Sequence, residues 1–144
     1  MKRACIAIVD AARARIYTYD QTTDGERSAG ALHEEIDLIN AGRRGHDPHD
    51  HRDAHAGELD RRFARHVISE IDRIAREHAH DRVLLVASPA MLGELRGVDR
   101  GLPPELQVEY VARDLARLTS PQIHDHLAQL RLVAPRRPMS VMRG

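Results

Sequence analysis

The sequence contains little cysteine and few aromatic residues. Cys5 is the only cysteine among 144 residues, so the chain cannot form an intrachain disulfide or a zinc site built from several cysteines. Cys5 lies within an apolar run, where a cysteine usually packs as a small buried hydrophobic residue. Tryptophan is absent, and the chain has one phenylalanine and three tyrosines. A surface on which nucleic-acid bases stack against aromatic rings is therefore not expected.

Long apolar runs and a surplus of charge of one sign are also missing. No stretch approaches the roughly 20 apolar residues of a membrane-spanning helix, and the run Ala4–Val9 is too short for the core of a signal peptide. A cytoplasmic location is the expectation. The 22 basic and 22 acidic residues cancel, so no overall field favours nucleic acid or an anionic membrane surface. Lys2 is the only lysine, and arginine supplies the other positive charges.

The length of the chain indicates one domain, because a chain of this size can bury about two thirds of its unfolded surface. We expect a single α/β domain at residues 1–131. Residues 132–144 are predicted to form a basic, irregular tail, since they contain Pro135 and Pro138 and no acidic residue.

Apolar and alternating patterns predict five strands. Continuous apolar runs are typical of strands covered on both faces, and alternation is typical of strands that are half exposed. The predicted strands occupy residues 4–9, 13–19, 31–40, 82–87 and 107–112. Residues 20–28 contain an Asp-Gly pair and are predicted to form a turn-rich connection. The strand at 31–40 is expected at an edge of the sheet, where it could pair with a second copy to form a homodimer.

Three helices are predicted between and after these strands. Apolar residues recur at three- and four-residue steps from residue 58 to 78, where His78 and His80 are expected to close the helix at the negative end of its dipole. Ser88-Pro89 and Ser120-Pro121 each combine an N-cap with a proline at the first helical position. The order β-β-β-α-β-α-β-α predicts a three-layer α/β domain with a mixed five-stranded sheet.

A polar loop at residues 41–57 concentrates histidine ahead of the long helix. Its histidines are His46, His49, His51 and His55, and aspartates stand between them. Imidazole and carboxylate ligands suit Zn²⁺, Ni²⁺ or Cu²⁺. One interpretation is a metal-binding protein or a metal-dependent hydrolase built on this loop. The other is a solvated loop that picks up metal only adventitiously, because the spacing matches no known helix or strand site.

Six arginines in and behind this loop form a second candidate site, for RNA or another partner. They are Arg43, Arg44, Arg52, Arg61, Arg62 and Arg65. Guanidinium groups suit phosphate, although neighbouring acidic residues nearly cancel their charge. RNA would then be bound through its shape and backbone, as ribosomal RNA often is, and not by base stacking.

Several stretches resemble known families. The segment Arg-Phe-Ala-Arg at residues 62–65 resembles one that follows the Gly-Gly-Gln loop in the middle domain of class-1 termination factors of eukaryotes and archaea, which are related to Pelota. Residues 9–17, 81–96 and 114–127 resemble the bacterial family named "protein required for attachment to host cells", a release-factor-like group. The resemblance covers about residues 4–130.

The resemblance implies a ribonuclease H-like, termination-factor middle-domain fold, but the chain departs from these families at their active sites. It contains no Gly-Gly-Gln, so peptidyl-tRNA hydrolysis is not expected. A ribonuclease H-type site needs several carboxylates around two Mg²⁺ ions about 4 Å apart. The fourth predicted strand is followed by Ser88-Pro89, with no acidic residue, and Asp10 is expected to form a turn.

The leading hypothesis is a non-enzymatic, cytoplasmic adaptor of the release-factor-like host-attachment family that contacts the ribosome or structured RNA. It needs no cofactor. The first alternative is a metal-binding protein or metal-dependent hydrolase that uses the histidine loop, with zinc or another divalent transition metal. The second alternative is a role in attachment to host cells, which the family name implies.

Overall fold

The computed structural model describes residues 3–41 and 53–137, with side chains described for residues 3–41 and 57–137. The nine elements of this part of the chain follow in order: β1 (Arg3–Val9), β2 (Arg13–Asp24), β3 (Arg27–Ile39), α1 (Asp53–Glu77), β4 (Arg82–Ala87), α2 (Pro89–Val98), the short 3₁₀ helix η1 (Asp99–Gly101), β5 (Gln107–Ala112) and α3 (Ser120–Gln129).

The five strands form one mixed sheet with the order β3-β2-β1-β4-β5. β1 pairs antiparallel with β2, and β2 pairs antiparallel with β3. β1 and β4 are parallel, as are β4 and β5, because helical crossovers lead into both later strands. The predicted α/β class and mixed five-stranded sheet are confirmed, and so is the position of β3 at an edge.

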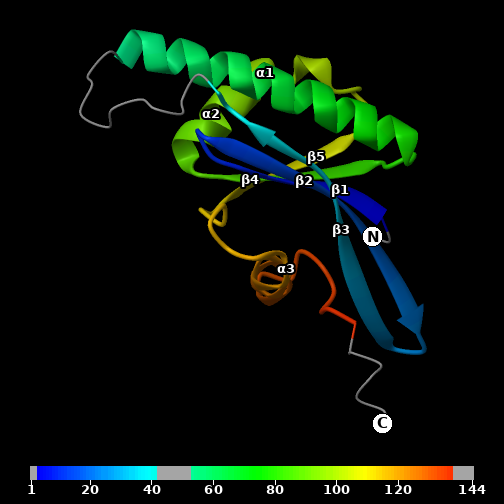
Figure 1. Cartoon of the computed structure of the whole chain (residues 1–144). Helices are drawn as coiled ribbons and strands as arrows, with labels where there is room; N and C mark the ends of the chain where they lie inside the picture. The colour runs from blue at the N-terminus through cyan, green and yellow to red at the C-terminus, as the bar shows by residue number, and fades with distance from the viewer. Residues whose placement is uncertain (1–2, 42–52, 138–144) are drawn as a thin grey trace.

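Helices cover both faces of the sheet (Figure 1). α1, α2 and η1 pack on one face, against alternate residues such as Cys5 and Ala7 of β1. α3 packs on the other face, against residues such as Ile6 and Ile8. Cys5 is fully buried, as predicted, and its burial, followed by the nearby charge of Glu35, raises the pKa of the thiol to about 12. This thiol is therefore a core group and not a nucleophile.

The hairpin between β2 and β3 is longer than the sequence predicts. The prediction of a turn-rich connection at residues 20–28 is wrong for most of these residues. β2 continues to Asp24, and β3 begins at Arg27. Only two residues turn the chain, and the first of them, Gly25, has a φ of 64°. A glycine adopts this angle without strain, so a tight turn is sufficient.

Two helices begin earlier than predicted. α1 begins at Asp53, so the end of the predicted loop at 41–57 is helical and His55 lies in the helix. α3 is capped by Thr119 and not by Ser120. Thr119 Oγ1 accepts a hydrogen bond from Gln122 N (3.3 Å), and Gln122 Oε1 accepts one from Thr119 N (2.9 Å), which forms a capping box. Ser88 caps α2, as predicted.

The segment after α3 returns across the sheet to the long hairpin. Gly30 N of β3 donates to Pro135 O (2.8 Å), and Arg137 N donates to Gly30 O (3.2 Å). Ala134 N donates to the hydroxyl of Tyr19 (2.8 Å), which itself donates to Gln21 Oε1 (3.0 Å). The first residues of the predicted tail are thus held by backbone pairing at β3, and a homodimer through residues 31–40 stays a prediction.

Gly30 should tolerate no side chain. A Cβ atom at this position would lie less than 3 Å from Cε1, Cζ and the hydroxyl oxygen of Tyr19. The ring is buried and its hydroxyl is held by two hydrogen bonds, so it cannot move aside freely. We expect Gly30→Ala to lower the free energy of unfolding by about 2–3 kcal/mol, measured by urea denaturation.

A second glycine provides the control for this measurement. A Cβ atom on Gly97 of α2 would meet nothing within 4 Å. Gly97→Ala should therefore raise the free energy of unfolding by about 0.5–1 kcal/mol, because alanine restricts the unfolded chain and favours the helix. Equal effects of the two substitutions would contradict the packing described for Gly30.

Candidate functional site

The long helix α1 carries two of the predicted arginines on its exposed side, at the edge of a groove. Its inner face is fixed by the buried residues Phe63, Val67 and Ile71, which pack on the sheet. The four-residue spacing of these residues turns Arg61 and Arg65 away from the sheet. The helical period thus places both guanidinium groups one turn apart on one edge of the helix.

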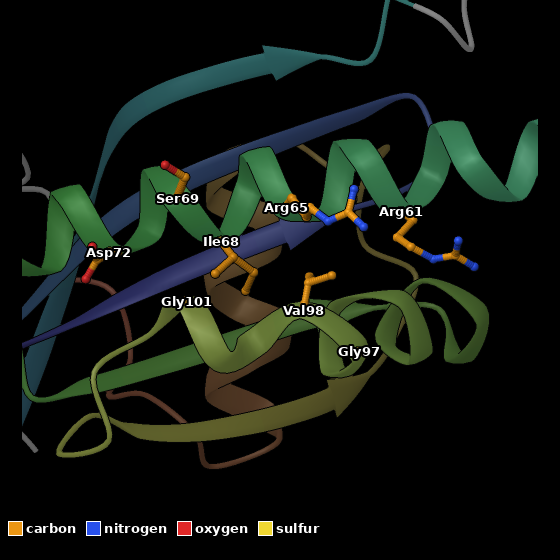
Figure 2. Close-up of a pocket in the computed structure, with 8 residues that line it drawn as sticks. All are labelled: Arg61, Arg65, Ile68, Ser69, Asp72, Gly97, Val98 and Gly101. Atoms are coloured by element: carbon orange, nitrogen blue, oxygen red, sulfur yellow. The ribbon is translucent and has the colours of Figure 1, made fainter.

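The groove lies between α1 on one side and α2 and η1 on the other (Figure 2). It has a volume of about 470 Å³. Its lining residues are Arg61, Arg65, Ile68, Ser69, Asp72, Gly97, Val98 and Gly101. Ile68 from α1 and Val98 from α2 form its apolar middle, as Figure 2 shows.

Two glycines shape the wall of the groove that faces α1. A Cβ atom on Gly101 would lie 3.1 Å from Cγ2 of Ile68, so glycine lets η1 approach the helix closely. A Cβ atom on Gly97 would extend into open space. Glycine at this second position therefore leaves room that a larger side chain would fill.

The two ends of the groove differ in charge. Arg61 Nε lies 3.7 Å from Glu94 Oε1 of α2, and 54% of the Arg61 side chain is exposed. Arg65 is exposed and makes no ion pair with any residue that the structure describes. At the far end, Asp72 Oδ1 accepts a hydrogen bond from Arg76 Nε (2.8 Å). An anion is therefore attracted to the Arg61–Arg65 end and not to the Asp72 end.

The third described arginine of the predicted set does not join this groove. Arg62 lies 3.9 Å from Glu58 and lines a separate hollow of about 240 Å³ with Phe63 and His66. The structure therefore brings Arg61 and Arg65 together and separates Arg62 from them. Arg43, Arg44 and Arg52 lie outside the described residues.

The predicted histidine metal site falls outside the described side chains. His46, His49 and His51 lie in the range that is not described, and for His55 only the helical backbone is described. Across the described residues, no three histidine, cysteine, aspartate or glutamate side chains gather closely enough to hold a metal ion. The metal hypothesis thus stays a prediction about the loop.

Asp10 has the structural role that the sequence predicts. Its Oδ1 accepts hydrogen bonds from the backbone N–H groups of Ala12 and Arg13, both at 2.8 Å. These bonds close the turn between β1 and β2, as aspartate side chains commonly do.

His80 is a buried residue whose burial the sequence did not predict. The prediction that it ends the long helix is wrong, because α1 ends at Glu77 and Ala79 turns the chain with a φ of 54°. His80 N donates to Ala75 O (2.8 Å), and its ring stacks on His78 with centroids 5.4 Å apart. Only 7% of the residue is exposed, and this burial, together with His78, lowers the pKa of the imidazole to about 4.

No sequence signal indicated the burial of His80. His80 stands among polar residues, His-Ala-His-Asp, at residues 78–81. Such a segment is typical of an exposed helix end. His80 stands two residues before β4, which begins at Arg82. The local sequence does not specify how this start of β4 is placed in the sheet, and the burial of His80 depends on that placement.

The fold and the groove define an α/β domain that carries a two-ended charged groove on its α1–α2 layer. A family model for "Protein required for attachment to host cells" matches residues 5–127. The chain belongs to this family, as its sequence resemblance predicted. No curated protein sequence matches the chain closely enough to count as a relative.

In the part of the chain that the structure describes, no helix combines enough length with enough apolar character to cross a membrane.

Proposed function

We propose that this host-attachment family protein is a non-enzymatic, cytoplasmic, release-factor-like adaptor that contacts the ribosome or another structured RNA. The observation that carries the proposal is the pair Arg61 and Arg65, exposed one helical turn apart at the open end of a groove. The proposed contact set, named here the arginine face, consists of Arg61 and Arg65 at the groove and Arg62, which follows Arg61 on α1 but lines a separate hollow.

The arrangement of this face suits phosphate. Side chains at i and i+4 on a helix are neighbours, with Cβ atoms about 5–6 Å apart. Both Arg61 and Arg65 can therefore reach one phosphate group or two adjacent ones. Arg65 is the better donor, because none of its charge is used by an ion pair within the described residues. Arg61 is held only by a long contact of 3.7 Å to Glu94, which phosphate can replace.

The topology supports the release-factor-like part of the proposal. Three antiparallel strands come first, and β4 and β5 are then added in parallel to β1 through helical crossovers. Ribonuclease H-like domains share this order of elements, and the middle domain of class-1 termination factors has a related arrangement. The chain has no Gly-Gly-Gln sequence, so the proposal includes contact with the ribosome without peptidyl-tRNA hydrolysis.

Ribosome co-sedimentation tests the proposal. The full chain should sediment with ribosomes at low salt. Replacing Arg61, Arg62 and Arg65 together with alanine should weaken this binding about ten-fold or more, because charge-assisted hydrogen bonds to phosphate are lost. The three side chains are largely exposed, so the variant should keep its fold, which circular dichroism checks.

A matched variant separates the arginine face from net charge. Arg27, Arg113 and Arg117 are also exposed and lie elsewhere on the molecule. Replacing these three with alanine removes the same formal charge and should leave sedimentation nearly unchanged. Binding that survives the first triple substitution, or that both triples weaken equally, would refute an arginine-face contact.

The family description provides a second candidate function, a role in attachment to host cells. Such a role is compatible with the adaptor proposal if the protein acts through another component that is itself at the cell surface. A deletion strain complemented with the arginine-face variant tests the connection. Restored attachment would show that the role does not depend on this face.

A further inference from the structure

We propose that Arg100 of η1 and Arg65 of α1 form a two-point contact, across the groove, with the phosphate backbone of a double-helical RNA segment. This inference rests on the proposed function, because it names a further contact residue and the form of RNA that the surface fits. Arg100 is not among the six arginines that the sequence indicated.

Two positive charges on the layer of α1, α2 and η1 have no partner. Arg65 and Arg100 are exposed, and neither contacts an acidic side chain or an aromatic ring of the described residues. The other described arginines of these helices each have such a partner: Arg61, Arg62, Arg73, Arg76 and Arg96. The acidic side chains of the same helices from residue 66 to residue 101 are also bonded: Glu70, Asp72, Glu77, Glu94 and Asp99. Arg65 and Arg100 are therefore the charges of this layer that are free to meet an anion.

The geometry of η1 points Arg100 toward solvent. A 3₁₀ helix has three residues per turn, so its successive side chains point about 120° apart. Asp99 accepts a hydrogen bond from the hydroxyl of Tyr110 on β5, and Gly101 lies against Ile68 of α1. These two contacts occupy the directions of β5 and α1. The direction that remains for Arg100 is outward, in agreement with its exposure.

The groove separates Arg65 from Arg100. Arg65 lines the groove from α1, and Gly101, the residue after Arg100, lines it from η1 (Figure 2). The two walls are fixed, because α1 packs on the sheet and η1 is closed by the hydrogen bond from Leu102 N to Asp99 O (3.0 Å). A groove of about 470 Å³ lies between them, so we expect each guanidinium group to bind a different phosphate of one backbone.

The shortage of exposed aromatic rings favours a double helix over a single strand. Phe63, Tyr17 and Tyr19 are buried, and the ring of Tyr110 lies under the guanidinium group of Arg96. Proteins that bind single strands gain much of their affinity from bases stacked on such rings. A double helix keeps its bases stacked internally and is recognised through its shape and backbone. Two rigidly placed cations without a stacking platform therefore fit double-helical RNA.

Fluorescence anisotropy of the full chain with a labelled RNA duplex of about 16 base pairs tests the inference. Arg100→Ala should weaken binding about ten-fold, because a charge-assisted hydrogen bond to phosphate is lost. The slope of log K against log salt concentration should fall by about 0.9, the value for one phosphate contact on a duplex. Arg100→Lys should restore this slope, since lysine keeps the positive charge.

Arg27 provides a matched control. It is exposed at the β2–β3 hairpin, and it makes no ion pair with any residue that the structure describes. Arg27→Ala removes the same formal charge and should leave duplex binding nearly unchanged. Replacing Arg65 and Arg100 together should weaken binding about a hundred-fold, because independent contacts add in free energy.

The outcomes distinguish this inference from the function on which it rests. Duplex binding that requires Arg61, Arg62 and Arg65 but survives Arg100→Ala would overturn the inference and leave the proposed function standing. Equal effects of Arg100→Ala and Arg27→Ala, or equal affinity for the duplex and for a single strand of the same length, would also overturn it. Absence of any binding to RNA or ribosomes would overturn the proposed function, and the inference with it.

Discussion

Replacing Arg15 with methionine is expected to lower the free energy of unfolding by about 3 kcal/mol. Arg15 lies on β2 with only 7% of its surface exposed. Its Nη1 donates to the carbonyl oxygens of Leu118 (2.7 Å) and Ala116 (3.4 Å), and its Nη2 donates to Ser120 Oγ (3.2 Å). These bonds tie the loop before α3 to the sheet. Methionine keeps much of the apolar stem but leaves both carbonyls without their donor.

Arg13 on the same strand provides the control. It forms an ion pair with Asp37 at 2.6 Å, but 39% of the Arg13 side chain and 37% of the Asp37 side chain are exposed. An exposed pair contributes little, so Arg13→Met should cost no more than about 1 kcal/mol. Urea denaturation of the two variants measures the difference. Similar losses would show that Arg15 does not anchor the loop.

Acidification from pH 7 to pH 4 is expected to remove up to about 3 kcal/mol of stability through His80 alone. Burial, then the charges of His78 and Arg3, lowers the pKa of His80 in the folded state to about 4, against the opposing effect of Glu35 and Asp81. The unfolded chain takes up this proton near pH 6.5, while the folded chain does not. The contribution of neutral His80 to the free energy of unfolding is therefore complete above pH 6.5. It falls as the pH drops and is lost near pH 4.

The difference between wild type and His80→Gln isolates this effect from the carboxylates that titrate in the same range. Glutamine carries no proton that titrates here, so the variant should lose less stability between pH 6.5 and pH 4 than the wild type. His66→Gln, an exposed position on α1, should follow the wild-type curve. Parallel curves for wild type and His80→Gln would contradict a buried, neutral imidazole.

The sheet could be predicted from the sequence because its strands have strong local patterns. β5 has the predicted bounds, Gln107–Ala112, and β4 has the predicted bounds, Arg82–Ala87. The β2–β3 hairpin was predicted too short, because turn-forming residues are spread over 20–28 and only Gly25 is needed for the turn. β2 continues to Asp24 because it pairs with β3 along its whole length. The hydrophobic pattern of one strand does not show how far a neighbouring strand pairs with it.

The candidate site could be predicted only in part. The sequence indicates Arg61, Arg62 and Arg65 because guanidinium groups close behind the histidine loop suit phosphate, and all three are exposed in the structure. The groove is lined by Gly97 of α2 and Gly101 of η1, and only Gly101 approaches α1 closely. Nothing in the local sequence indicates that α2 and η1 pack beside α1. For the same reason, only the structure shows that Arg62 lines a different hollow from Arg61 and Arg65.

The salt dependence of RNA binding tests the central claim, contact between the arginine face and phosphate, most directly. The slope of log K against log salt concentration counts the phosphate contacts, at about 0.7 per contact for a single strand and about 0.9 for a duplex. If Arg61, Arg62 and Arg65 each meet a phosphate of the structured RNA, their joint replacement by alanine should reduce this slope by about 2–3. An unchanged slope, measured by filter binding from low to physiological salt, would contradict the account.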